Sequence, residues 1–190
     1  FRASTGAAEP RDAKASELGV KTWKEGFASA LAHDHVVSAS EVQGTVGFDR
    51  IEITVQVAGL IVDKPALRKK HHPQAKEISP SDQRKTTDAM LGEDQLDLRK
   101  FPTITFVSSA IVKEANGHAV TGQLKIHGVT KTVKTIARIS EKDGILTGDA
   151  SFRLKVSDYG ITPYSAALGS IKVKDEVELV LHLVSAASGP

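Results

Sequence analysis

The sequence predicts an all-β protein, a closed antiparallel barrel of about eight strands with one helical insertion at 79–92. Two observations predict the sheet. Apolar residues recur at every second position along most of the chain, and short segments with glycine or aspartate separate these stretches. A third observation predicts the insertion, because the segment 63–100 abandons the period of two.

The clearest strand pair lies in the stretch 117–139. Val120, Gly122, Leu124 and Ile126 fall on one side of an extended chain, and Gly128 then allows a tight turn into a second strand. The same alternation predicts strands within 41–50, 51–60, 101–112, 144–158 and 175–184, and a further strand is expected between 21 and 37.

The segment "SPSDQRKTTDAML" has the signals of a helix. Ser79 or Ser81 can cap its first turn, Pro80 suits that turn, and Gly92 can end it. Its last residues, Ala89, Met90 and Leu91, would place an apolar patch against the sheet.

Barrel closure and a hollow interior are expected for two reasons. Closing a sheet removes its exposed edges, and a barrel of eight strands holds either its own side chains or one small ligand. Only 5% of the residues are aromatic, and many inward positions carry small or β-branched side chains. Small side chains leave room, so the composition favours a cavity.

The 190 residues fit one domain, and we expect a leader at 1–17, a barrel domain at 18–184 and a tail at 185–190. The 25 Lys and Arg residues nearly balance the 23 Asp and Glu residues, and one Trp and two Tyr offer few stacking platforms, so no nucleic-acid partner is expected. The absence of cysteine excludes disulfides and thiolate metal sites. A signal peptide removed from the chain stays an open alternative.

Motifs for enzymatic chemistry are missing. The chain has no Gly-x-Ser-x-Gly, no His-Glu-x-x-His and no glycine-rich phosphate loop, so we expect no enzyme. A metal-dependent enzyme remains an alternative through His33 and His35, which would share one face of a strand. Turn and backbone hydrogen bonds explain that pair better, and no metal site is expected.

Two further segments have a functional and a structural interpretation. The loop with Tyr159 and Tyr164 suits a cavity mouth, because tyrosine joins an apolar ring to a polar tip, or it packs on the barrel end. The basic run from Arg68 to His72 could meet a diphosphate or an anionic membrane, but a solvated loop is the commoner case.

Four segments, in this order, resemble the YceI-like family of bacterial polyisoprenoid-binding proteins over roughly 18–184: "KEGFASALAHDHVV", "FPTITFVSS", "GQLKIHGVTKTV" and "DYGITPYSAALGSIKVKDEVELVL". The resemblance implies a lipocalin-like barrel that holds an isoprenoid-type lipid, with a polyprenyl or quinone tail, and needs no other cofactor. It also implies a periplasmic or secreted protein. Near Asp63 the chain departs from the better-known members, which carry an Asp-x-x-Ser-x-x-Thr pattern there.

If such a ligand is bound, the tail should contact the apolar strand faces: Val55, Val57, Phe106, Leu124, Ile126, Phe152, Leu179 and Leu181. The head group or mouth should involve Arg84, His127, Tyr159 and Tyr164. The third alternative is a stress-protective protein with a filled core. We expect a monomer or homodimer with transient membrane contact at most.

Overall fold

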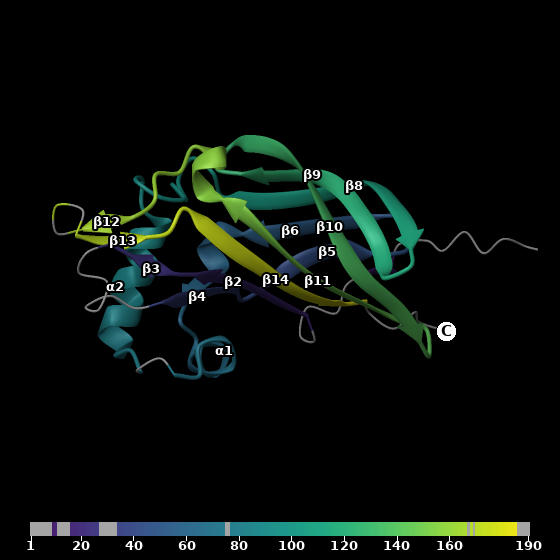
Figure 1. Cartoon of the computed structure of the whole chain (residues 1–190), viewed down its shortest axis with the longest axis horizontal. Helices are drawn as coiled ribbons and strands as arrows, with labels where there is room; N and C mark the ends of the chain where they lie inside the picture. Colours follow the sequence, from purple (N-terminus) through teal and green to yellow (C-terminus); the bar gives the residue numbers. More distant parts are fainter. Residues whose placement is uncertain are drawn as a thin grey trace, which may run out of the picture.

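The structure is a computed structural model that describes residues 9–10, 16–26, 34–74, 77–166, 168 and 170–185. Within these residues the chain forms two antiparallel sheets and two α-helices (Figure 1). In chain order the strands are β1 (Glu9–Pro10), β2 (Glu17–Thr22), β3 (Lys24–Glu25), β4 (His35–Ala39), β5 (Val42–Val46), β6 (Ile51–Gln56), β7 (Leu60–Val62), β8 (Thr103–Glu114), β9 (Gly117–Ile126), β10 (Val129–Lys142), β11 (Ile145–Lys155), β12 (Ser165–Ala166), β13 (Ile171–Val173) and β14 (Glu176–Val184).

The large sheet is open, so the prediction of a closed barrel is wrong. Its strand order is β1-β5-β6-β8-β9-β10-β11-β14-β2-β4-β7, and it curls into a half-barrel of 11 strands rather than about eight. No ladder among the described residues joins β7 to β1 or β5. The short β12, β13 and β3 form a separate sheet at one end. Alternation fixes which face of a strand is buried, but it carries no information on whether two distant edges meet.

The chain crosses from one side of the half-barrel to the other after β6. A 3-10 turn, η2 (Val57–Gly59), follows β6 and leads directly into β7 on the opposite edge of the sheet. The Ser40 N–H donates to the Gly59 carbonyl at 2.9 Å, which ties this turn to the chain between β4 and β5. The chain therefore passes from β6, the third strand in the sheet order, to the edge strand β7, and no ladder among the described residues joins these two strands.

Strand β10 joins the two halves of the sheet. Its first part, Val129 to Ala137, pairs with β9, and its second part, Ala137 to Lys142, pairs with β11. Within β10, Ala137 is the only residue that pairs with both neighbouring strands, with His118 of β9 and Ala150 of β11. The sheet is therefore continuous through β10, although β9 and β11 pair with different parts of that strand.

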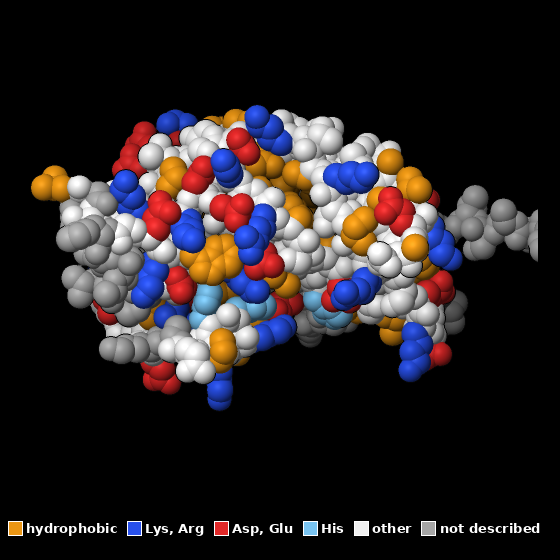
Figure 2. Space-filling view, in the orientation of Figure 1, with side chains coloured by type: hydrophobic (Ala, Val, Ile, Leu, Met, Phe, Trp, Pro, Cys, Tyr) orange, Lys and Arg blue, Asp and Glu red, His pale blue; other side chains and the backbone are white. Residues whose placement is uncertain are grey.

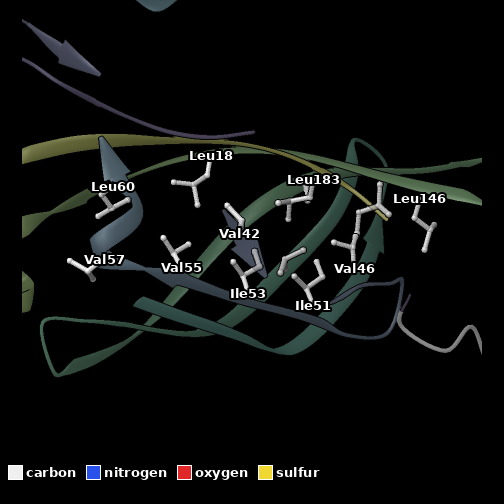
Figure 3. Close-up of a cluster of buried hydrophobic side chains, with 13 residues drawn as sticks. Leu18, Val42, Val46, Ile51, Ile53, Val55, Val57, Leu60, Leu146 and Leu183 are labelled. Atoms are coloured by element: carbon white, nitrogen blue, oxygen red, sulfur yellow. The ribbon is translucent and has the colours of Figure 1, made fainter. Parts of the chain in front are cut away.

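The interior contains apolar side chains from both halves (Figure 3). Val55, Ile53 and Ile51 of β6 face Leu18 of β2 and Leu183 of β14 across the half-barrel. Each of these side chains is at most 9% exposed. The alternation predicted for β9 is confirmed, since Val120, Gly122 and Leu124 are buried and Gln123 is exposed.

The predicted helix at 79–92 is confirmed as α2 (Pro80–Leu91), with Ser79 as its N-cap and Gly92 at its C-cap. The Ser79 hydroxyl accepts from the Asp82 N–H at 3.1 Å. A second helix, α1 (Pro65–His71), was not predicted, and it lies where the basic run suggested a loop. It packs on the outer face of β4, where Val36 and Ser38 are almost fully buried.

Candidate functional site

An apolar cavity of about 480 Å³ runs along the inside of the half-barrel. Every second residue of β14 from Val177 to Leu183 borders it, which corresponds to roughly 20 Å of strand at ~3.3 Å per residue. β11 contributes residues from Gly148 to Leu154 in the same alternating manner. The wall is therefore almost entirely hydrocarbon, as expected when a period-two apolar face has no second layer to cover it.

The volume indicates the size of molecule that fits. An engineered apolar cavity of ~150 Å³ holds a benzene molecule, so a cavity about three times larger has room for a chain of roughly 18 carbons. The value also lies within the ~300–1,000 Å³ of small-molecule sites.

Most of the predicted lining residues border the cavity. These are Val55, Phe106, Leu124, Ile126, Phe152, Leu179 and Leu181. Four of them form two cross-strand pairs: Phe106 lies opposite Leu124, and Phe152 lies opposite Leu179. Whether they contact a ligand stays a prediction.

Val57 lies outside the lining. It opens η2 rather than continuing β6, so the alternation that points Val55 inward ends one residue before it. Its side chain is 1% exposed and belongs to the packed core instead. A 3-10 turn within an apolar stretch has no clear sequence signal, which is why the strand was predicted to continue.

The predicted head-group residues are not gathered at one place. Tyr164 borders the cavity and is 47% exposed. Arg84 is exposed on α2 and does not line the cavity. His127 and Tyr159 lie together away from it, with the His127 Nδ1 3.3 Å from the Tyr159 carbonyl oxygen. Burial, with the nearby Asp158 charge, raises the pKa of the Tyr159 hydroxyl.

The sequence analysis missed several polar residues that border the cavity. Lys85, Thr86 and Gln95 come from α2 and the turn after it, and Lys174 follows β13. The spacing of Lys85 and Ala89, one helical turn apart, was an available signal, since both lie on the face of α2 that borders the cavity. Lys174 had no such signal, because it lies in an irregular connection.

A buried charge cluster fixes His35, the one histidine among the described residues that border the cavity. The His35 Nδ1 lies 2.6 Å from an Asp63 carboxylate oxygen, and the other oxygen accepts from the Val36 N–H at 3.0 Å and from Arg68 at 2.9 Å. Arg68 also donates to the Asp34 carbonyl at 2.7 Å. Arg68 is 5% exposed, so the solvated-loop interpretation of the basic run does not hold for this residue.

The Asp63 pKa reports the balance in this cluster. Burial by itself raises it, but hydrogen bonds from His35 and Val36, with the charge of Arg68, hold the pKa below its ordinary value. Asp63 also has φ of 53°, in the left-handed region that aspartate tolerates better than most residues. Its carboxylate anchors β4 to α1.

The metal alternative finds little support in the part of the chain that is described. His33 lies outside the described residues, and the His35 ring is engaged by Asp63. The described residues contain no group of three His, Cys, Asp or Glu side chains able to hold a metal ion.

No helix in the described ranges is both long and apolar enough to span a membrane.

Comparison with known proteins identifies relatives of this chain. A UPF0312 protein of Yersinia enterocolitica is 34% identical over 94 residues, which is 46% of this chain and 46% of that protein. A UPF0312 protein of Yersinia pestis is 33% identical over 98 residues, 48% of each chain. The chain thus spans about half the length of the curated relatives it matches.

Solved structures share the fold. The crystal structure of Burkholderia cenocepacia BcnA matches with a TM-score of 0.69 and 21% identity, over 93% of this chain and 99% of that one. A Campylobacter jejuni YceI protein matches with a TM-score of 0.54 and 14% identity, over 100% of this chain and 91% of that one.

The family model described as YceI-like domain matches residues 12–185, which takes in the whole predicted domain at 18–184. Both the sequence match and the curled sheet agree with the resemblance found in the strand motifs. The chain therefore belongs to the YceI-like domain family.

Proposed function

We propose that this protein binds one long apolar molecule of isoprenoid type, a polyprenyl or quinone tail, inside the half-barrel and carries or sequesters it without catalysis. The observation that carries the proposal is the cavity of about 480 Å³ whose wall is built from the inner faces of most of the strands. An elongated hydrocarbon chain is the chemistry that such a wall selects.

Energetics favour selection by the tail rather than the head. Each buried CH₂ contributes about 0.8 kcal/mol, so one five-carbon unit contributes roughly 4 kcal/mol before ordering costs. A single neutral hydrogen bond at the head group contributes only about 1 kcal/mol. Four buried units would exceed several such bonds even after the chain has lost its rotational freedom.

The same proposal covers where the protein works. A periplasmic or secreted location, with transient contact to a membrane that donates or receives the lipid, suits a carrier that shields a hydrocarbon from water. One ligand per chain is expected whether the protein is a monomer or a homodimer, because the cavity lies within a single half-barrel.

Mass spectrometry of an organic extract tests the proposal. The purified protein should release close to one isoprenoid-type molecule per chain. Leu124→Glu should lose it, because the 4% exposed Leu124 borders the cavity and an unpaired carboxylate there opposes an apolar guest. Gln123→Glu is the matched control, since the neighbouring side chain is exposed on the outer face.

The alternatives give different results. A folded Leu124→Glu protein that still yields the lipid in full would refute cavity binding. An extract free of apolar molecules, from protein that also fails to take up added isoprenoid alcohol, would favour the filled-core, stress-protective alternative.

A further inference from the structure

The wall of the half-barrel has an opening between β10 and β11. Their ladder runs from Lys142–Ile145 to Ala137–Ala150 and stops there, although β10 extends back to Val129 and β11 on to Lys155. A bond from the Thr135 hydroxyl to the Ser151 carbonyl, at 3.3 Å, is the last hydrogen bond across it. We call the space between 131–134 of β10 and 152–154 of β11 the β10–β11 opening.

A groove of about 360 Å³ occupies this opening. Val133, Phe152 and Leu154 border both the groove and the apolar cavity, so the two spaces meet at these side chains. The space-filling view shows hydrophobic side chains at the bottom of a hollow between the two strands, with lysine and arginine on either side (Figure 2). Asp158 and Tyr159 of the 3-10 turn η3 (Val156–Tyr159) close its end.

The groove is positively charged. Lys131, Lys134 and Arg153 border it against one carboxylate, that of Asp158. Arg153 is already engaged, pairing with Glu176 at 2.9 Å and lying 5.4 Å from the ring centre of Trp23. Lys131 and Lys134 have no ion pair within the described residues.

The backbone adds hydrogen-bond donors. In an antiparallel strand, alternate residues direct their N–H and C=O groups to opposite sides. Before Ala137, β10 is paired on the β9 side only, so alternate N–H groups of this stretch face the opening. Amide donors beside two lysines suit a compact anion that accepts several hydrogen bonds.

We propose that the β10–β11 opening holds the anionic head group, a phosphate ester, of the molecule whose tail fills the cavity. Lys131 and Lys134, which lie on opposite faces of β10 and both border the groove, bind the phosphate from two sides, and the tail passes between Val133 and Phe152 into the interior. This inference rests on the proposed function and adds the head-group chemistry and its location. The mouth beside α2 is the competing site, with Lys85, which lies 3.9 Å from the Asp82 carboxylate, and Lys174.

Two probes with one tail test the inference: a four-unit isoprenoid alcohol and its monophosphate ester. We expect the wild-type protein to bind the ester more tightly than the alcohol. Lys131→Gln with Lys134→Gln should weaken ester binding by roughly tenfold or more and leave alcohol binding within about twofold. Lys131→Arg with Lys134→Arg should retain ester binding, and unchanged melting temperatures would show that the variants fold.

The matched control is Lys85→Gln with Lys174→Gln, which removes two charges at the mouth. Ester binding lost in this control but kept in the β10–β11 variant would overturn the inference, as would equal wild-type affinities for ester and alcohol. Inorganic phosphate at the same concentration should not displace the ester; displacement would indicate a free-anion site instead. Failure of both probes to bind would refute the proposed function itself.

Discussion

Phe106 on β8 and Leu124 on β9 are direct cross-strand partners, and both side chains border the cavity. The ring of Phe106 also lies over Gly122, where an added Cβ would stand 2.5 Å from a ring carbon and 2.6 Å from the Val107 carbonyl oxygen. The wall at this point therefore requires glycine at position 122, because a side chain there would overlap Phe106.

Two glycines of the inner wall, Gly122 and Gly148, should respond oppositely to alanine. Gly122→Ala should lower the free energy of unfolding by about 1–3 kcal/mol, because the new methyl group overlaps Phe106 and the backbone. At Gly148 the nearest atom to a new Cβ is 3.9 Å away, in Val46, so Gly148→Ala should raise the free energy of unfolding by about 0.5–1 kcal/mol. Urea denaturation measures both, and the same sign for both would contradict this wall geometry.

Filling the cavity should abolish binding without unfolding the protein. Ala150 borders the cavity opposite Leu181, so Ala150→Phe places a ring in space that the ligand would occupy. We expect isoprenoid alcohol binding to fall by roughly tenfold or more, since a few displaced CH₂ groups suffice, with a melting temperature close to that of the wild type. Ala110→Phe, the same change at an exposed alanine, is the control. Full binding by a folded Ala150→Phe protein would place the ligand elsewhere.

Affinity should depend on tail length up to the capacity of the cavity. For isoprenoid alcohols of two, three and four units we expect a gain of roughly tenfold per unit, because ordering costs offset most of the roughly 4 kcal/mol of burial per unit, and little further gain at eight units. The reason is the cavity volume of about 480 Å³, beyond which added units remain in water. Competition against a fluorescent apolar probe measures the series. Affinity that keeps rising to eight units would contradict a cavity of this volume.

The Asp63 cluster should make stability depend on acid. Folding lowers the Asp63 pKa, so the carboxylate stabilises the fold at pH values above the ordinary aspartate pKa of about 3.9, and this stabilisation is lost as pH falls through the lowered value. Asp63→Asn should therefore lower the free energy of unfolding by about 3 kcal/mol near pH 7, because Arg68 loses its buried partner. The loss should become progressively smaller in acid, as the pH falls below the lowered Asp63 pKa. Urea denaturation as a function of pH measures it.

The control for Asp63→Asn is Asp149→Asn. Asp149 also contacts a histidine, His182 at 2.7 Å, but both side chains are about half exposed. We expect a much smaller loss of stability there, because solvent screens exposed pairs. Equal losses in the two variants would show that burial does not set the strength of the Asp63 cluster.

Local patterns predicted the strands and the inward faces well. The positions of Leu124 and Ile126 follow from alternation, and those of Ser79 and Gly92 follow from helix-end chemistry. Closure of the sheet was predicted wrongly, because it depends on whether distant edges meet. The 3-10 turn η2, which takes Val57 out of the lining, is only three residues long and so shows no hydrophobic periodicity that could have predicted it.

The missed features involve long-range contacts. Asp63 and His35 are 28 residues apart in sequence, and nothing in either segment indicates that they touch. Helix α1 was hidden by its charged residues, although Pro65 at its first turn was a usable signal. The β10–β11 opening arises because β10 changes partners at Ala137, which the smooth alternation of that strand does not reveal.

Photolabelling tests the central claim most directly. An isoprenoid alcohol with a photoreactive diazirine at the tail end should attach to the protein at one probe molecule per chain. Peptide mapping should place the label on inner residues such as Leu124 and Leu181. Excess unlabelled alcohol should suppress it. Label spread over outer-face residues such as Gln123, or labelling that does not saturate, would contradict a tail held inside the half-barrel.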